Sequence, residues 1–183
     1  MREPVLPQLN ADEYLHWEAR QPEKFELHHG FVMAFAGGTL DHDRIGLNLR
    51  IAFDRLFPEP CRSFGADVKV RVSASTFYYA DAGIVCGDVE LQASIVNAPR
   101  VVAEVLSPST HAYDLVEKRA AYRGLSSLEF YVIVHTTIRR IEVDARGADG
   151  AWSTTVADQG DAYLGGRVLP LEDVYARSSL GAQ

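Results

Sequence analysis

Two carboxylates interrupt stretches of sequence that are otherwise apolar and typical of β-strands. Asp81 lies within residues 78–85 (YYADAGIV), and Glu104 lies within residues 101–106 (VVAEVL). A carboxylate inside a central strand is costly unless it is paired or binds a metal ion. If the two strands are neighbours, the two acidic groups stand side by side and their mutual repulsion calls for a cation. The sequence therefore predicts a site where two acidic side chains share a positive charge.

A lysine follows at a position from which it could reach the same site. Lys118 lies near the end of the first turn of a predicted helix over residues 114–123, which returns the chain toward the sheet. Lysine is rare in this chain, since the 18 basic residues include only Lys24, Lys69 and Lys118. An ammonium group held beside a reacting centre stabilises negative charge that develops there.

Each of these residues also has an ordinary structural interpretation. Asp81 could belong to an edge strand or a turn, Glu104 could form an ion pair with Arg119 or Arg123, and Lys118 could lie on the surface of its helix. The three residues together form a more specific pattern than any one of them alone.

Length and composition limit the classes of protein that fit. The chain has 183 residues, 47% hydrophobic and 23% charged, which is typical of one globular domain with a sizeable core. A net charge of -7 excludes a generic polyanion binder, so any contact with nucleic acid requires a local basic strip. No apolar run is long enough to span a membrane, and residues 1–4 lack the start of a signal peptide.

The cysteine content indicates the compartment. Cys61 and Cys86 are too few for a disulfide framework, and neither belongs to a CxxC pair of a zinc site. We therefore expect a soluble, cytoplasmic protein of a reducing compartment.

The predicted elements give a mixed α/β chain with a central mixed β-sheet flanked by helices. Asn10 and Glu13 form a predicted capping box for a first helix over residues 11–20. Apolar residues at three- and four-residue spacing predict a long helix over residues 41–57, and the third helix is 114–123. The predicted strands cover residues 24–27, 31–35, 62–72, 77–86, 101–106, 130–134 and 139–143.

The ends of the chain are less regular. Residues 1–9 contain two prolines and predict an extended arm. Residues 147–183 contain weak strands around 152–156 and a last helical turn near 171–175. No repeat, low-complexity tract or linker divides the chain, so residues 1–183 are predicted to form a single nuclease-like domain, a description that rests on the resemblance below.

Several motifs give the sequence a resemblance to a known family. From about residue 14 to residue 143 it resembles the Uma-type family of restriction endonucleases, within the PD-(D/E)XK nuclease superfamily. The most specific part is the stretch from Glu104 to Tyr122. The motifs are Phe25-Glu26-Leu27 with Gly30, Gly37-Gly38-Thr39 with His42, Tyr79-Ala80-Asp81, the run VAEVLSPST over residues 102–110, and the spacing of Asp114, Lys118 and Tyr122.

This resemblance implies a restriction-endonuclease-like core and a set of site residues. Asp81 and Glu104 would be metal ligands, and Glu26 would help to complete the metal site. The superfamily's usual lysine two residues after the glutamate is replaced by Leu106, so Lys118 would supply the ammonium from the following helix. Further residues that would support the site are His42, Asp114 and Tyr122.

Two positions depart from the family pattern. Ala80 stands where the family has a proline, a change that loosens the backbone but keeps the carboxylate of Asp81. His135 stands near a place where many members carry an aspartate, and the sequence assigns no role to it.

The expected chemistry is hydrolysis of phosphodiester bonds in DNA. A divalent, oxygen-liganded ion, most simply Mg²⁺ with Mn²⁺ as a substitute, activates water and neutralises charge in the transition state. The main hypothesis is a Mg²⁺-dependent endodeoxyribonuclease, and a homodimer is expected because double-strand cutting needs two sites. Candidate phosphate contacts, among which the sequence does not choose, are Arg44, Arg50, Arg55, Lys69, Arg71, Arg119 and Arg123.

Two hypotheses of other classes remain open at this stage. One is a non-catalytic module of nuclease fold that binds nucleic acid or protein, or that assembles as a dimer. The other is a sheet protein in which the acidic residues only form ion pairs.

Overall fold

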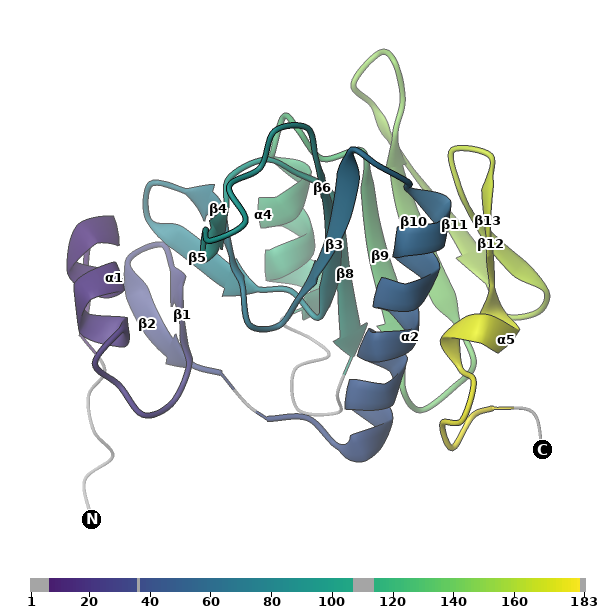
Figure 1. Cartoon of the computed structure of the whole chain (residues 1–183), viewed down its shortest axis with the longest axis horizontal. Helices are drawn as coiled ribbons and strands as arrows, with labels where there is room; N and C mark the ends of the chain where they lie inside the picture. The colour runs from purple at the N-terminus through teal and green to yellow at the C-terminus, as the bar shows by residue number, and fades with distance from the viewer. Residues whose placement is uncertain (1–6, 36, 107–113, 182–183) are drawn as a thin grey trace.

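The computed structural model describes residues 7–35, 37–106 and 114–181 (Figure 1). Its helices are α1 (Ala11–Glu18), α2 (Leu40–Leu56), α4 (Arg119–Arg123) and α5 (Leu171–Val174), and the π-helical turn η1 (Asp114–Lys118) precedes α4. The strands are β1 (Phe25–His28), β2 (Phe31–Ala34), β3 (Cys61–Gly65), β4 (Lys69–Ser73), β5 (Thr76–Tyr79), β6 (Ala82–Cys86), β7 (Ile95–Val96), β8 (Pro99–Leu106), β9 (Phe130–His135), β10 (Ile141–Arg146), β11 (Trp152–Ala157), β12 (Asp161–Leu164) and β13 (Arg167–Pro170).

The strands form two mixed sheets and one small hairpin. The larger sheet has the order β11-β10-β9-β8-β6-β3, and only its β8–β9 pair is parallel. The smaller sheet has the order β2-β1-β5-β4-β7, and β12 pairs with β13. The predicted mixed α/β architecture, with helices flanking mixed sheets, is confirmed.

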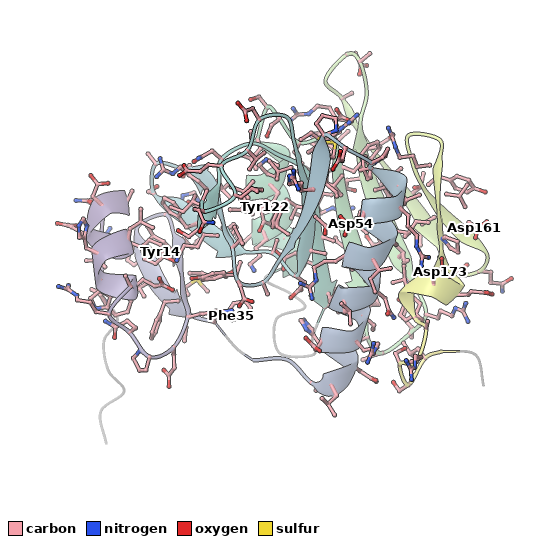
Figure 2. The ribbon with its side chains drawn as sticks, viewed as in Figure 1. Tyr14, Phe35, Asp54, Tyr122, Asp161 and Asp173 are labelled. Carbon is pink, nitrogen blue, oxygen red and sulfur yellow. A yellow bond between two sulfur atoms is a disulfide. The ribbon has the colours of Figure 1, made fainter. Side chains whose placement is uncertain are left out.

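The larger sheet is covered on both faces, so its central strands are buried throughout. Side chains of β8 alternate between the faces, because successive residues of a strand point in opposite directions. Val101, Ala103 and Val105 pack in the core beneath α2, whereas Val102 and Leu106 pack with Tyr122 of α4. Figures 1 and 2 show α2 and α4 on opposite faces of this sheet. Glu104 shares the alternation of Val102 and therefore faces α4.

The first two helices begin where local sequence chemistry places them. Asn10 and Glu13 form the predicted capping box of α1, with hydrogen bonds of 2.9 and 3.0 Å. Thr39 caps α2 by accepting a hydrogen bond from the His42 backbone N–H at 3.3 Å. Both helices end within two residues of the predicted positions.

Two predicted strands each divide into a pair. The predicted strand 62–72 contains β3 and β4, and the predicted strand 77–86 contains β5 and β6. In each case the first and second strands belong to different sheets. Between β5 and β6 the chain stays largely buried, with Ala80 fully covered, so hydrophobicity alone does not reveal the change of sheet there. One of these breaks is Ala80–Asp81, which places Asp81 at the junction of the two sheets.

The predicted helix 114–123 is present but begins in another form. Residues Asp114–Lys118 form the π-helical turn and α4 ends before Gly124, as expected from the sequence. The side chain of Asp114 lies outside the described part of the chain, so its predicted capping and site-supporting roles remain predictions.

The C-terminal region closes over the core beneath α2. The predicted last helical turn is α5, and Leu171, Val174 and Tyr175 are fully buried in the core cluster that contains α2 residues. Asn48 of α2 donates to the backbone oxygens of Val174 and Ala176 at 3.0 and 2.8 Å. These hydrogen bonds hold α2 against the segment around α5, which lies beside it (Figure 1).

Two further observations bear on the expected compartment. Cys61 and Cys86 lie opposite each other on β3 and β6 and form a disulfide with a Cα–Cα separation of 3.9 Å. The expectation of a reducing compartment did not anticipate this bond. Within the described ranges, no helix is long and apolar enough to cross a membrane.

Candidate active site

Asp81 connects the two sheets and lies beside Glu104. The last recorded pair of β6 and β8 is Ala82 with Ala103, so the next residue on each strand is Asp81 or Glu104. The Asp81 carboxylate accepts a hydrogen bond from the Val105 backbone N–H at 2.7 Å. Asp81 therefore directly precedes β6 and lies opposite Glu104 of the adjacent strand β8.

Glu104 is buried and hydrogen-bonded on the face covered by α4. Its side chain is 4% exposed, and its Oε1 accepts from the Tyr122 hydroxyl at 3.1 Å. The same oxygen lies 3.5 Å from the Lys118 ammonium. The alternative that Glu104 pairs with Arg119 or Arg123 is wrong, because both arginines bind Asp144 instead.

Lys118 lies between two carboxylates. Its ammonium donates to Glu26 at 2.9 Å and lies 3.5 Å from Glu104, and its side chain is only 6% exposed. It also lies 5.2 Å from the centre of the Tyr78 ring, within range of a cation–π contact. The alternative that Lys118 is an ordinary helix-surface residue is therefore wrong. The ammonium group supplies the positive charge that the buried carboxylates require.

Glu26 brings the smaller sheet into the site. It lies on β1, is 5% exposed, and accepts from the Tyr79 backbone N–H at 2.9 Å as well as from Lys118. One carboxylate oxygen thus joins a strand of the smaller sheet to the helix that covers the larger one. The predicted acidic residues and the lysine are brought together from both sheets and from the π-helical turn.

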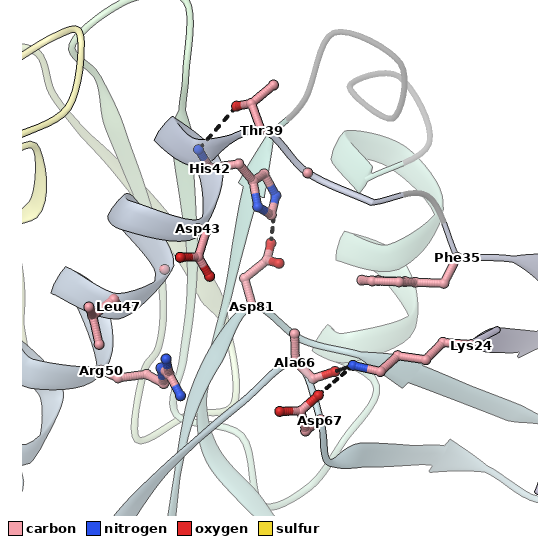
Figure 3. A pocket seen from close by; sticks show the side chains of 12 residues that line it. Lys24, Phe35, Thr39, His42, Asp43, Leu47, Arg50, Ala66, Asp67 and Asp81 are labelled. Carbon is pink, nitrogen blue, oxygen red and sulfur yellow. Dashed lines mark hydrogen bonds and ion pairs between the residues drawn. The ribbon is translucent and has the colours of Figure 1, made fainter. Parts of the chain in front are cut away.

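A pocket opens beside Asp81, and its lining includes neither Glu104 nor Lys118. Its volume is about 320 Å³, and the side chains that Figure 3 labels come from α2, from the turn after β3 and from the segments around β1 and β2. His42, predicted as a supporting residue, lines this pocket and its Nε2 lies 3.5 Å from Asp81 Oδ2. Asp81 therefore lines the solvent-facing pocket, while Glu104, the residue opposite it on β8, belongs to the buried cluster with Lys118 and Glu26.

Tyr122 is held in its protonated form. Burial, reinforced by the negative charge of Glu104, raises the pKa of its hydroxyl well above the usual value of a tyrosine. The hydroxyl therefore remains a donor to Glu104 at all physiological pH values. Tyr122 therefore orients Glu104, while its role in supporting a reactive site stays a prediction.

One residue that sequence reasoning did not select, Tyr78, also contacts the cluster, and it in turn bonds His28. Tyr78 is fully buried, lies beside Lys118 and bonds His28 Nδ1 through its hydroxyl at 2.5 Å. Burial, and secondarily the neighbouring His29, lower the pKa of His28. The sequence signal for Tyr78 was its place three residues before Asp81, but an aromatic residue in a strand is typical of the core and gave no reason to select it.

The donor chemistry of the site suits a hard divalent cation. Among the described residues, both recorded contacts of the Asp81 carboxylate go to Oδ2, which leaves Oδ1 without a hydrogen-bond partner there. The described residues contain no group of three or more His, Cys, Asp or Glu side chains arranged to hold a metal ion. Mg²⁺ nevertheless suits such a site, because it keeps several waters and binds through one or two carboxylates together with substrate phosphates.

The other candidate residues lie elsewhere. Arg119 and Arg123 are bound to Asp144 on the surface formed by β10 and β11. His135, the departure from the family pattern, is buried and bonds Glu142 at 3.1 Å, so it belongs to that same ion-pair cluster. Among the remaining predicted phosphate contacts, only Arg50 lines the pocket beside Asp81, within the part of the chain that the structure describes.

Comparison with known proteins decides the family. The sequence pattern of the Uma2 family, described as "Putative restriction endonuclease", matches residues 11–176. The chain belongs to the Uma2 family. The predicted family membership is thereby confirmed, and the match includes every predicted site residue.

Relatives of this Uma2 protein are known from cyanobacteria. An uncharacterized protein of Synechocystis sp. is 33% identical over 150 residues, which cover 80% of this chain and 79% of that protein. A second uncharacterized Synechocystis protein is 28% identical over 157 residues, covering 80% and 86% of the two chains.

A solved structure shares the fold. The crystal structure of a putative nuclease belonging to DUF820 from Anabaena variabilis superimposes with a TM-score of 0.72 at 15% identity, covering 92% of this chain and 98% of that one. The restriction-endonuclease-like fold class is thereby confirmed. At this level of identity the likeness concerns the fold alone.

Proposed function

We propose that this Uma2 protein is a Mg²⁺-dependent endodeoxyribonuclease that hydrolyses phosphodiester bonds of DNA. The observation that supports this most is the position of Asp81, which lines a solvent-facing pocket and lies opposite Glu104, a member of a buried cluster of two carboxylates and one ammonium. An ion-pair cluster that served stability alone would not need a further carboxylate at the pocket.

The proposed metal ligands are Asp81, which directly precedes β6, and Glu104 on the adjacent strand β8. A bound Mg²⁺ would generate the nucleophilic water and neutralise charge on the phosphoryl group. Asp81 is oriented for this role by the Val105 backbone N–H and by His42, which both bind its Oδ2 and leave Oδ1 directed away from them.

Lys118 is proposed to stabilise negative charge at the reacting phosphate. Glu26 holds the ammonium at 2.9 Å, and the longer 3.5 Å separation from Glu104 leaves that second contact weaker. Tyr122 fixes Glu104 by donating to it, so that the ligand and the ammonium keep their relative positions. Glu26 and Tyr122 act in this scheme as positioning residues.

A non-catalytic nuclease-fold module is the second candidate function, and one observation favours it. Glu26, Glu104 and Lys118 have exposed fractions of only 3–5%, and the pocket is lined by Asp81 but by none of these three residues. A substrate phosphate would reach Lys118 only after a local rearrangement. A binding module would not need that rearrangement.

The decisive experiment is metal-dependent nicking of supercoiled plasmid, with Mg²⁺ or Mn²⁺ and with EDTA. We expect the wild type to nick DNA only with the metal, and Asp81→Asn to lose the activity. The matched control is Asp161→Asn, which removes one carboxylate from an exposed position on β12. Absence of nicking by the wild type with every metal and DNA substrate would favour the non-catalytic module.

A binding measurement separates loss of metal from loss of chemistry. An ion that binds only the folded protein raises its melting temperature. Millimolar Mn²⁺ should stabilise the wild type and the Asp161→Asn control but not Asp81→Asn. Equal shifts in all three proteins would contradict the assignment of Asp81 as a metal ligand.

The proposed reaction also bears on assembly. A chain with one such site cuts one strand at a time, so double-strand cutting would need two copies. Sedimentation of the protein with and without a DNA duplex would test the proposed homodimer.

A further inference from the structure

Arg50 points from α2 into the pocket beside Asp81 and lacks an ion-pair partner among the described residues. Its Nε is buried without a hydrogen-bond partner. Figure 3 shows its guanidinium in the lower part of the pocket, on the same side of α2 as Asp43. An arginine carries five N–H donors, and leaving a buried one unsatisfied is costly. Such a residue is suited to bind a ligand that supplies acceptor oxygens.

Lys24 also lines this pocket, and its charge is already neutralised. Lys24 donates to Asp67 at 2.5 Å and to the Ala66 carbonyl at 2.8 Å. The hydrogen bond from Lys24 is the main reason that the pKa of Asp67 lies below its usual value, and Arg50 contributes only a minor part. The charge of Lys24 is therefore committed within the protein, whereas that of Arg50 is not paired at hydrogen-bond distance.

The side chain of Arg50 passes close to the backbone at Gly65, where β3 ends. A Cβ added at Gly65 would lie 2.9 Å from both Cδ and Nη1 of Arg50. The arginine therefore crosses directly over a glycine, and any larger residue there would displace it. This close approach presents the guanidinium at the pocket at a defined position.

We propose that Arg50 binds a backbone phosphate of the DNA duplex, next to the phosphodiester that reacts at Asp81. The proposal rests on the proposed function and deepens it by naming the group that positions the substrate. A phosphate diester offers two charged oxygens that match the planar fork of a guanidinium. Arg50 is thus a positioning residue in the pocket, distinct from Lys118 in the buried cluster.

The acidic lining of the pocket sets a condition on this contact. Asp43 and Asp81 both line the pocket and would repel a phosphate. A divalent cation at Asp81 removes much of that repulsion, so DNA binding through Arg50 should require the cation. This requirement also agrees with the net charge of -7, which gives the protein little general affinity for DNA.

The test is binding of a fluorescent duplex, followed by anisotropy with Ca²⁺ or EDTA over a range of salt concentrations. We expect Arg50→Met to weaken binding about tenfold or more with Ca²⁺, and to reduce the slope of log affinity against log salt by about 0.9 for one lost phosphate contact. The matched control is Arg55→Met on the same helix. Arg55 is 71% exposed and lies 4.0 Å from Asp173, on the side of α2 away from the pocket.

Two further variants separate position from charge. Gly65→Ala keeps every charge but displaces Arg50, so it should weaken binding nearly as much as Arg50→Met. Arg50→Lys should restore only part of the affinity, because an ammonium does not form the two parallel hydrogen bonds of a guanidinium. Urea unfolding of all the variants checks that each remains folded under the assay conditions.

The outcomes distinguish this inference from the proposed function. If Arg50→Met and Arg55→Met bind equally, or if the wild type does not bind duplex DNA, the assignment of Arg50 is overturned. If the wild type nicks plasmid while Arg50→Met raises KM with little change in kcat, both proposals are supported. If the wild type binds DNA through Arg50 but never nicks it, the phosphate contact stands and the nuclease function fails.

Discussion

Two neighbouring residues, Lys118 and Arg119, belong to two buried ion-pair clusters that differ in their balance of acidic and basic groups. Lys118 turns toward Glu26 and Glu104 between the sheets. Arg119 turns toward Asp144 and Glu142 over strand β10. Two consecutive residues thus belong to two different clusters. The cluster around Lys118 is the proposed active site, and the cluster around Arg119 is an ordinary structural ion-pair network with which it can be compared.

In the Arg119 cluster, the acidic groups are matched by basic and hydrogen-bonding partners. Asp144 is completely buried and contacts Arg119, the Arg123 guanidinium and the Thr154 hydroxyl. Glu142 contacts Arg119 and also His135. Two carboxylates therefore face two guanidinium groups, and each buried oxygen of Asp144 has a donor. Hydrogen bonding to Asp144 is the main reason that the pKa of Arg119 lies above its usual value.

The Lys118 cluster carries an excess of negative charge among the described residues. One ammonium serves Glu26 and Glu104, and Asp81 lies alongside with one oxygen that has no hydrogen-bond partner there. A buried network that only stabilised the fold would be expected to balance its charges, since an uncompensated buried carboxylate is costly. The two clusters therefore differ in charge balance as well as in composition, and the proposed cation would restore that balance among the described residues.

The largest effect is expected for stability in the Arg119 cluster. Arg119→Met leaves the buried Asp144 with only one guanidinium, so the free energy of unfolding should fall by about 3–5 kcal/mol. Urea denaturation measures this, with Arg62→Met as a control at an exposed position on β3. A loss no larger than that of the control would mean that the cluster contributes little to stability.

The next effect is expected for the rate of DNA nicking. Lys118→Met removes a donor to developing negative charge, so kcat should fall by about 10²- to 10³-fold. It should also lower stability, because Glu26 and Glu104 lose their buried counter-charge. Nicking is therefore compared per folded molecule with that of Arg119→Met. If Arg119→Met loses as much rate, the division between a reactive and a structural cluster is wrong.

A smaller effect on stability is expected when one negative charge is removed from the Lys118 cluster. Glu104→Gln removes one negative charge while Lys118 keeps its bond to Glu26, so the free energy of unfolding should change by no more than about 1 kcal/mol. The increase in melting temperature with Mn²⁺ should disappear. Asp144→Asn provides the opposite pattern, with a large loss of stability and an unchanged response to Mn²⁺. The same thermal denaturation series with and without Mn²⁺ measures both.

The smallest effect concerns pH and His28. Because burial lowers its pKa in the folded state, the unfolded chain binds the proton more readily, and the stability associated with neutral His28 is lost as pH falls below about 6.5. This loss of stability stops increasing once the pH is below the lowered pKa of His28 in the folded protein. His28→Gln should therefore lose less stability than the wild type between pH 7.5 and pH 5.5, as measured by urea denaturation. Parallel pH profiles would show that His28 does not titrate with folding.

Local sequence chemistry was sufficient for several features of this protein. The capping box of α1 and the apolar stripe of α2 specify those helices through contacts within a few residues. The carboxylates at Asp81 and Glu104 stood out because acidic groups are rare in apolar strands, Lys118 stood out because lysine is rare in this chain, and the family motifs added Glu26. These signals are local or depend on residue type, so they can be read without knowing how the strands pair.

Only the tertiary structure decided how those residues meet. The break at Ala80–Asp81 separates strands of two different sheets, which the continuous apolar pattern conceals. The ion-pair partners of Lys118 and Arg119 also depend on which strand each side chain faces. The sequence contains many acidic residues that either side chain could pair with, and it does not choose among them. Ion pairs between distant segments are set by strand order and register, and a pattern of residue types along the chain does not contain that information.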